Sequence, residues 1–214
     1  LRLSSNLQIE TLEKKDIERL GFGGLLAVSQ GSKNQPSVII LKHNPYKRKN
    51  KPIVIIGKTV TFDSGGISLK ASKNMEWMRY DKCGGISVLT IMQIIDSMKL
   101  DIPVIGILGA AENMPGDSAI RPGDIIKMYN GKSVEIKNTD AEGRLILADM
   151  LSYSKKFQPE IIIDIATLTG AVITALGKEA SAAIGSCQKL INDLLICSAD
   201  SGAVSYTHLT LPTI

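Results

Sequence analysis

The 214-residue sequence contains few cysteines, histidines and aromatic side chains. Cys83, Cys187 and Cys197 form no C-x-x-C pair, which argues against a thiolate zinc site and is typical of reduced thiols in an intracellular protein. The two histidines, His43 and His208, cannot form a His-x-x-x-His metal motif. Because aromatic residues make up only 4% of the chain, the core is expected to rest on aliphatic side chains.

The sequence also lacks long apolar runs and concentrated charge. No stretch approaches the roughly 20 apolar residues that a membrane helix requires, and the N-terminus shows no secretory signal. The net charge of +4 is spread along the chain apart from Lys47–Lys51, a run more typical of a solvated loop than of a nucleic-acid surface. We therefore expect a soluble, cytoplasmic protein with neither a membrane nor a nucleic acid as partner.

Apolar runs alternate with helical periodicity along the chain. Apolar residues recur at three- and four-residue steps after Gly84 and again after Ala141, which indicates two helices. The alternation predicts an α/β fold with a mostly parallel central sheet flanked by helices on both faces. The expected strands are Ser37–His43, Ile53–Gly57, Pro103–Ala110 and Ile161–Ala166, and a short helix within Leu7–Leu20 is expected to end at a glycine-rich turn over Gly21–Gly24.

Acidic residues collect in two segments that are expected to lie near strand ends. The first is Gly57–Gly66 (GKTVTFDSGG), continued by Lys70 and Asp81, and the second is Asn138–Arg144 (NTDAEGR). In open sheets of this kind, ligands bind at the carboxyl ends of the strands. The loops in which chemistry is expected are those after Gly57, Lys137 and Ala166.

Together the two segments predict a metal site rich in oxygen ligands. Carboxylate clusters suit divalent cations, and two cations held about 3.5–4 Å apart can polarise a carbonyl and activate a water. Taken singly, each residue has an ordinary structural interpretation. Asp140 and Glu142 suit the caps of the helix that follows. Asp63 suits a plain turn, and Asp81 and Lys70 suit a solvated surface.

The joint pattern resembles the leucyl (cytosol) aminopeptidase family. The resemblance rests on the signature Asn138–Leu145 (NTDAEGRL) and runs without an apparent gap from about Leu20 to about Gly202. It implies a two-metal-dependent aminopeptidase that hydrolyses the N-terminal residue, preferably leucine-like, from peptides. The other matching stretches are Thr61–Gly66, Met78–Asp81, Ala111–Pro115 and Asp164–Gly170.

The resemblance implies five metal ligands. Asp63 and Glu142 would contact both metals. Lys58 and Asp81 would complete the tighter site, and Asp140 the more exchangeable one. Carboxylates accept zinc, manganese or magnesium, so the metal is not specified by these residues.

The resemblance also implies catalytic and substrate-binding residues that are not metal ligands. A bridging water would attack the peptide carbonyl, Lys70 would add positive charge at the oxyanion, and Arg144 would hold a bicarbonate ion that acts as general base. Family members are typically hexamers, so a homo-oligomer is expected. The implied substrate-binding residues are Met78, Asn138, Thr167, Leu168 and Gly170.

Two features depart from the family pattern. The separate N-terminal α/β domain of the family is almost absent, and the match ends near Gly202. We therefore interpret residues 1–202 as part of the catalytic domain, with its C-terminal portion missing, and residues 203–214 as a tail of non-native type. Two other functions stay open: a catalytically silent relative that binds partners such as DNA, and a dinuclear hydrolase of phosphate esters.

Overall fold

The structure, a computed structural model, describes residues 7–44 and 51–206. The chain divides into two compact units, Leu1–Leu168 and Thr169–Ile214. The basic run Lys47–Lys51 lies outside the described residues except for Lys51, as does the interpreted tail from residue 207 onward. No helix within the described ranges combines the length and the apolar character needed to cross a membrane.

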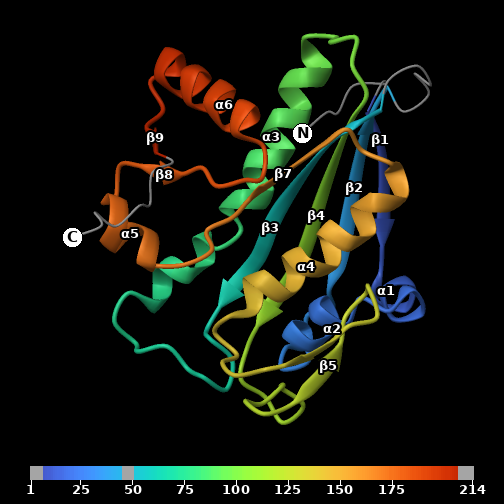
Figure 1. The fold of residues 1–214 in the computed structure, drawn as a ribbon. Coiled ribbons are helices and arrows are strands. Elements are labelled where there is room, and N and C mark those ends of the chain that lie inside the picture. Colours follow the sequence, from blue (N-terminus) through green and yellow to red (C-terminus); the bar gives the residue numbers. More distant parts are fainter. Residues whose placement is uncertain (1–6, 45–50, 207–214) are drawn as a thin grey trace. The chain divides into compact units, whose positions relative to one another are not determined.

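A five-stranded mixed sheet forms the centre of the first unit (Figure 1). Its strands are β1 (Leu7–Leu12), β2 (Ser37–His43), β3 (Ile53–Asp63), β4 (Val104–Asn113) and β7 (Ile161–Ile165), in the order β1-β2-β4-β3-β7. Strand β2 runs antiparallel to both of its neighbours, whereas β3 is parallel to β4 and to β7. All strands except β2 therefore point the same way, which confirms the predicted mostly parallel sheet.

Helices cover both faces of this sheet. Helix α3 (Cys83–Ser97) lies on one face, where Met92 packs in a cluster with Ile55 of β3. Helices α2 (Gly23–Ser29) and α4 (Glu142–Ser154) lie on the other face, where Ile146 packs in a cluster with Val54 and Ile56. Because successive strand residues point to opposite faces, a strand covered on both sides must be apolar at every position, which explains the continuous run in β3.

Strand β3 is longer than the sequence predicts, and this changes the place of Lys58. The expected strand ended at Gly57, but pairing with β4 continues as far as Asp63, which lies opposite Asn113. The register shifts between Val60 and Asp63, so a bulge interrupts the ladder there. Lys58 is therefore a buried strand residue, and the first acidic loop begins only after Asp63.

The structure confirms one expectation near the N-terminus and corrects another. The short helix is α1 (Lys14–Leu20), which ends as predicted at Gly21, and the residues before it, Leu7–Leu12, form a strand paired with β2 that the sequence did not indicate. Of the glycine-rich turn expected over Gly21–Gly24, Gly21 does lie in a turn, whereas Gly23 and Gly24 begin α2. A Cβ at Gly23 would lie 1.8 Å from the carbonyl oxygen of Lys127, so glycine here permits a close backbone approach.

The second acidic segment follows a small ribbon outside the central sheet. Strands β5 (Ile125–Lys127) and β6 (Ser133–Glu135) form this antiparallel pair. The loop after Lys137 therefore leads from the ribbon into α4, and does not follow a strand of the main sheet. Short 3₁₀ helices at Met75–Tyr80 and Lys155–Phe157 complete the first unit.

The second unit is small and mostly helical. It contains α5 (Ala171–Leu176), α6 (Gln188–Ser201) and the parallel pair β8 (Ser181–Ala182) and β9 (Ser205–Tyr206). Ile191 is the buried residue of α6.

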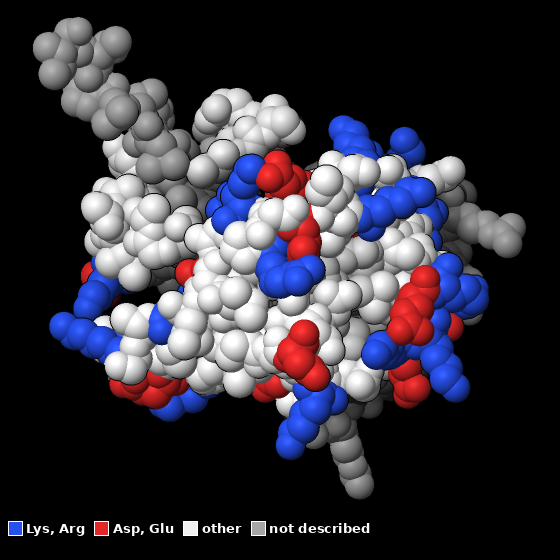
Figure 2. Space-filling model, turned by 90° about the horizontal axis from the view of Figure 1, so that it is seen from below, with Lys and Arg blue, Asp and Glu red and all other residues white. Residues whose placement is uncertain are grey.

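Charges of both signs are mixed on the face drawn in Figure 2, where Lys and Arg side chains lie among Asp and Glu. Surface ion pairs of the first unit show the same mixing. They include Arg19–Asp16, Lys42–Glu10 and Arg121–Asp124. The mixture matches the spread of charge along the sequence.

Candidate active site

The first acidic loop begins where β3 and β4 end side by side. Asp63 ends β3, and the chain then turns at Gly65 and Gly66, whose φ angles of 89° and 66° favour glycine. The backbone N–H of Lys70 donates to the carbonyl oxygen of Ser64 over 2.9 Å. This closure brings Lys70 back beside Asp63.

The second acidic loop delivers two carboxylates at the start of α4. The side-chain oxygen of Asn138 accepts a 2.8 Å hydrogen bond from the backbone N–H of Asp140, a local turn typical of asparagine. Glu142 follows in the first helical turn and is only 2% exposed. The helix axis therefore begins at the carboxylate cluster.

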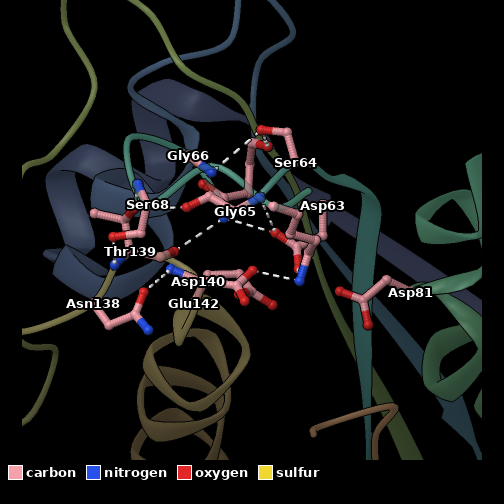
Figure 3. Close-up of polar contacts among 12 residues, drawn as sticks. Asp63, Ser64, Gly65, Gly66, Ser68, Asp81, Asn138, Thr139, Asp140 and Glu142 are labelled. Atoms are coloured by element: carbon pink, nitrogen blue, oxygen red, sulfur yellow. Dashed lines mark hydrogen bonds and ion pairs between the residues drawn. The ribbon is translucent and has the colours of Figure 1, made fainter. Parts of the chain in front are cut away.

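Three carboxylates converge from the two loops (Figure 3). One oxygen atom each from Asp63, Asp140 and Glu142 lies within 4.8 Å of the others. Within the described part of the chain, the buried Oε2 atom of Glu142 has no hydrogen-bond partner. A buried oxygen without a donor is costly unless a cation or water satisfies it, and an all-oxygen set of this kind suits divalent cations. The residues present therefore fit a metal site.

Lys58 ties β3 to three other parts of the chain. Its Nζ atom lies 2.7 Å from Oδ2 of Asp81 and 2.8 Å from Oε1 of Glu142, and it donates to the carbonyl oxygen of Thr167 over 2.9 Å. The hydroxyl of Thr167 donates to Asp81 over 2.6 Å. Asp81, which directly precedes the N-terminal end of α3, is thereby held against β3 and the loop after β7.

Lys70 supplies the second ammonium group. Its Nζ atom lies 2.9 Å from Oδ2 of Asp63 and also contacts Oδ1 of Asp140. Lys58 and Lys70 together face four carboxylates, so negative charge is in excess in this cluster. Excess negative charge in a mostly buried site favours the binding of cations.

Burial perturbs the acids and bases of the cluster. Burial raises the pKa of Glu142 to about 7, with Lys58 opposing the rise and Asp63 adding to it. Burial likewise raises the pKa of Asp81, against the opposing charge of Lys58. Burial acts to lower the pKa of Lys70, but hydrogen bonds to Asp140 and Asp63 outweigh it, so that pKa is raised. Perturbed groups gathered in one place mark a candidate functional site.

The structure brings together all five residues that the resemblance implies as ligands. Lys58 links Asp81 to Glu142, and Lys70 links Asp63 to Asp140. Their roles as ligands stay predictions, because the contacts show only that the side chains meet.

The other predicted residues differ in how exposed they are. Arg144 is exposed in the first turn of α4, two residues after Glu142. Met78 is half-buried in the 3₁₀ helix that leads to Asp81. Thr167 and the 44%-exposed Leu168 follow β7, and Asn138 is exposed beside Asp140. Gly170 belongs to the second unit, where it caps α5.

No role was predicted from the sequence for Asn113, Thr139 or Ser68, although their hydrogen bonds join the two acidic loops. Asn113 is 2% exposed and donates to Asp63, and Thr139 is 1% exposed and exchanges hydrogen bonds with Ser68. Asn113 lies in the matching stretch Ala111–Pro115 and Thr139 lies inside the signature, which was the only signal the sequence offered.

Comparison with known proteins identifies the family to which this sequence is similar. The cytosol aminopeptidase family, catalytic domain, matches residues 2–209. A probable cytosol aminopeptidase of Vesicomyosocius okutanii is 53% identical over 193 residues, covering 90% of this chain and 40% of the relative. Another, from Cenarchaeum symbiosum, is 54% identical over 176 residues, covering 82% of this chain and 36% of the relative.

A third relative, a probable cytosol aminopeptidase of Methylobacillus flagellatus, is 46% identical over 203 residues, or 95% of this chain. The chain again covers 40% of that relative, so it spans about two fifths of the length of the curated proteins it matches. The match nevertheless includes both acidic loops and the sheet that positions them. The chain belongs to the cytosol aminopeptidase family and carries sequence of its catalytic domain.

Proposed function

We propose that this chain provides the metal site of an aminopeptidase that releases the N-terminal residue from peptides. The observation that carries the proposal is the meeting of Asp63, Asp140 and Glu142 at one point, with a buried oxygen of Glu142 left without a donor among the described residues. The family match directs this cluster toward peptide bonds and away from the alternative of phosphate esters.

Two divalent cations would be held by the five side chains of the cluster. Asp63, which contacts Lys70, and Glu142, which contacts Lys58, are the candidates for contact with both ions. Lys58 and Asp81 would serve one ion, and Asp140 the other. Bound cations, whether zinc, manganese or magnesium, would supply Lewis acidity at the scissile carbonyl and lower the pKa of a water toward neutrality.

Lys70 is suited to stabilise the negative charge that develops on the carbonyl oxygen. Its raised pKa keeps the amine cationic at neutral pH, and its side chain remains 24% exposed, so the ammonium group can be reached from solvent. An oriented cation in a partly dry site stabilises an oxyanion more strongly than it would in water.

Arg144 is suited to hold a planar anion. Its exposed guanidinium lies in the first turn of α4, where the helix dipole also favours negative charge. A bicarbonate held there would act as a general base for the proton of the attacking water.

The substrate would enter with its free amine toward the cations, which restricts cleavage to the N-terminal residue. Met78 and Leu168 offer apolar surface for a leucine-like side chain. Asn138 and Thr167 are the other members of the proposed substrate-binding set within the first unit, and a role for Gly170 stays a prediction of the resemblance alone.

Cytoplasmic location and a homo-oligomeric assembly are part of the same proposal. The relatives are named cytosol aminopeptidases, which supports the location. Nucleic acid is not proposed as a partner, because the net charge is only +4 and the basic side chains in Figure 2 lie among acidic ones.

The proposal is tested by hydrolysis of leucyl-p-nitroanilide after metal removal and addition of Mn²⁺ or Zn²⁺. We expect wild type to release p-nitroaniline only with added metal and Asp140→Ala to lose that activity. Asp117→Ala, a matched change at an exposed turn after β4, should retain it. Equal activity in Asp140→Ala, or none in folded, metal-loaded wild type, contradicts the proposal.

A further inference from the structure

The two acidic loops come from distant parts of the chain, and one buried amide bonds to both. The Nδ2 atom of Asn113 donates to Oδ1 of Asp63 over 2.8 Å and to the carbonyl oxygen of Thr139 over 3.1 Å. Both partners are acceptors, so the network requires the nitrogen of the amide to face them. The two N–H bonds of one side chain are thereby divided between the two loops.

Thr139 makes a second connection between the same loops. Its hydroxyl donates to the carbonyl oxygen of Gly65 over 2.6 Å and accepts the backbone N–H of Ser68 over 2.8 Å. The hydroxyl of Ser68 in turn accepts the backbone N–H of Thr139 over 3.2 Å. Figure 3 shows Thr139 and Ser68 together where the loops meet.

This network also fixes which oxygen of Asp63 faces Lys70. Oδ1 accepts from Asn113 and from the backbone N–H of Gly65 over 3.0 Å, whereas Oδ2 is the atom beside Lys70. The carboxylate therefore cannot rotate without breaking two hydrogen bonds. Its partner residue on β4 is held as well, because the carbonyl oxygen of Asn113 accepts both the backbone N–H and the hydroxyl of Ser64.

Such connections are needed because like charges meet here. Carboxylates within 4.8 Å repel each other, and the repulsion is larger in a buried site than in water. Lys58 and Lys70 offset part of this repulsion, but two ammonium groups face four carboxylates, so a net repulsion between the loops remains. Hydrogen bonds between neutral groups of the two loops oppose this repulsion without adding charge.

We propose that Asn113 and Thr139 are positioning residues that hold the two acidic loops in the arrangement required for metal binding. The inference rests on the proposed function, since it concerns how the same carboxylates bind metal. Neither side chain is a ligand in this account. Each acts through the loops it joins, and removal of either should weaken metal binding by roughly 10–100-fold, as is typical for groups that orient metal ligands.

The test compares Thr139→Val, which has nearly the same shape but no hydroxyl, with Thr139→Ser, which keeps the hydroxyl. Thr90→Val is the matched control, because Thr90 is exposed and its hydroxyl donates to the carbonyl oxygen of Ile86 within α3. Metal-free chains are titrated with Mn²⁺ by calorimetry, and hydrogen exchange of residues 65–70 is followed without metal. Asn113→Ala is carried in parallel as a second, independent variant.

We expect Thr139→Val and Asn113→Ala to bind Mn²⁺ more weakly and to exchange faster at residues 65–70, while Thr139→Ser and Thr90→Val resemble wild type. Faster exchange with unchanged Mn²⁺ affinity would show a purely structural role and overturn the inference. Unchanged exchange in Thr139→Val would also overturn it. A wild-type chain that binds no Mn²⁺ would instead contradict the proposed function, and with it the inference.

Discussion

Gly143 lies so close to Lys58 that even a methyl group should disturb the site. A Cβ at position 143 would lie 2.7 Å from Cε and 2.9 Å from Nζ of Lys58. Carbon atoms prefer separations of about 3.5–4.0 Å, so the end of the lysine would have to move by roughly 1 Å. It cannot move freely, because Nζ is held by Asp81, Glu142 and the carbonyl oxygen of Thr167.

Two opposing effects set the size of the change in Gly143→Ala. Alanine favours a helix over glycine by about 1 kcal/mol, which would stabilise α4. Against this, a displacement of Lys58 lengthens bonds that are each worth about 1.5–3 kcal/mol when one partner is charged. We expect a net loss of about 1–3 kcal/mol, typical of overpacking in a dense site.

Thermal unfolding followed by circular dichroism measures the outcome. The expected loss corresponds to a fall in melting temperature of roughly 2–4 °C per kcal/mol for a chain of this size. Gly185→Ala is the matched control, since its Cβ would meet Ile191 at an ordinary 3.7 Å. An unchanged or higher melting temperature in Gly143→Ala would show that helix propensity outweighs the contact with Lys58, contrary to this prediction.

Three further predictions concern a core side chain, a buried carboxyl group and a hydrogen bond to Asp81. Met92→Ala should lower the free energy of unfolding, measured by chemical denaturation, by about 2–5 kcal/mol, because it leaves a cavity between α3 and the sheet. Met98→Ala, at the exposed end of α3, should change it by less than about 0.5 kcal/mol. Equal losses in the two variants would contradict the burial of Met92 against the sheet. Burial raises the pKa of Asp149 against the opposing backbone N–H donors, so the folded state binds its proton more tightly. Asp149 therefore contributes its full stabilisation at pH values below about 3.9, the pKa of an aspartate in the unfolded chain. This contribution is lost as the pH rises through the higher pKa of Asp149 in the folded state. Urea unfolding should show the advantage of wild type over Asp149→Asn to be larger near pH 4 than near pH 7, and the reverse trend would contradict the sign. Thr167→Val should weaken Mn²⁺ binding by roughly tenfold, measured by calorimetry, because the hydroxyl orients Asp81; unchanged affinity would contradict that role.

Much of the fold can be predicted from the sequence where burial repeats regularly. The strand Ser37–His43 has the predicted bounds, and α3 and α4 follow their apolar periodicity. Strand β1 could not be predicted in the same way, because Leu7–Leu12 becomes a strand through pairing with β2. Helix α2 was hidden by Gly23 and Gly24, which allow close contacts with distant backbone atoms that local propensity does not describe.

The candidate site could likewise be predicted only in part. The carboxylates of Asp63, Asp140 and Glu142 were predicted to act together, and they do lie together. No role could be predicted for Asn113 and Thr139. Their hydrogen-bond partners become neighbours only when the fold brings together two loops some 70 residues apart. The place of Lys58 was also missed, since the length of β3 depends on its pairing with β4.

The carboxylate cluster is proposed to bind two divalent cations. The direct measurement is the number of Mn²⁺ ions bound per metal-free chain at equilibrium dialysis, with Asp63→Asn beside wild type. We predict two ions per wild-type chain and fewer in Asp63→Asn, because Asp63 lies beside Asp140 and Glu142 and is proposed to contact both ions. No bound Mn²⁺ in folded wild type, or equal binding in Asp63→Asn, would contradict the account.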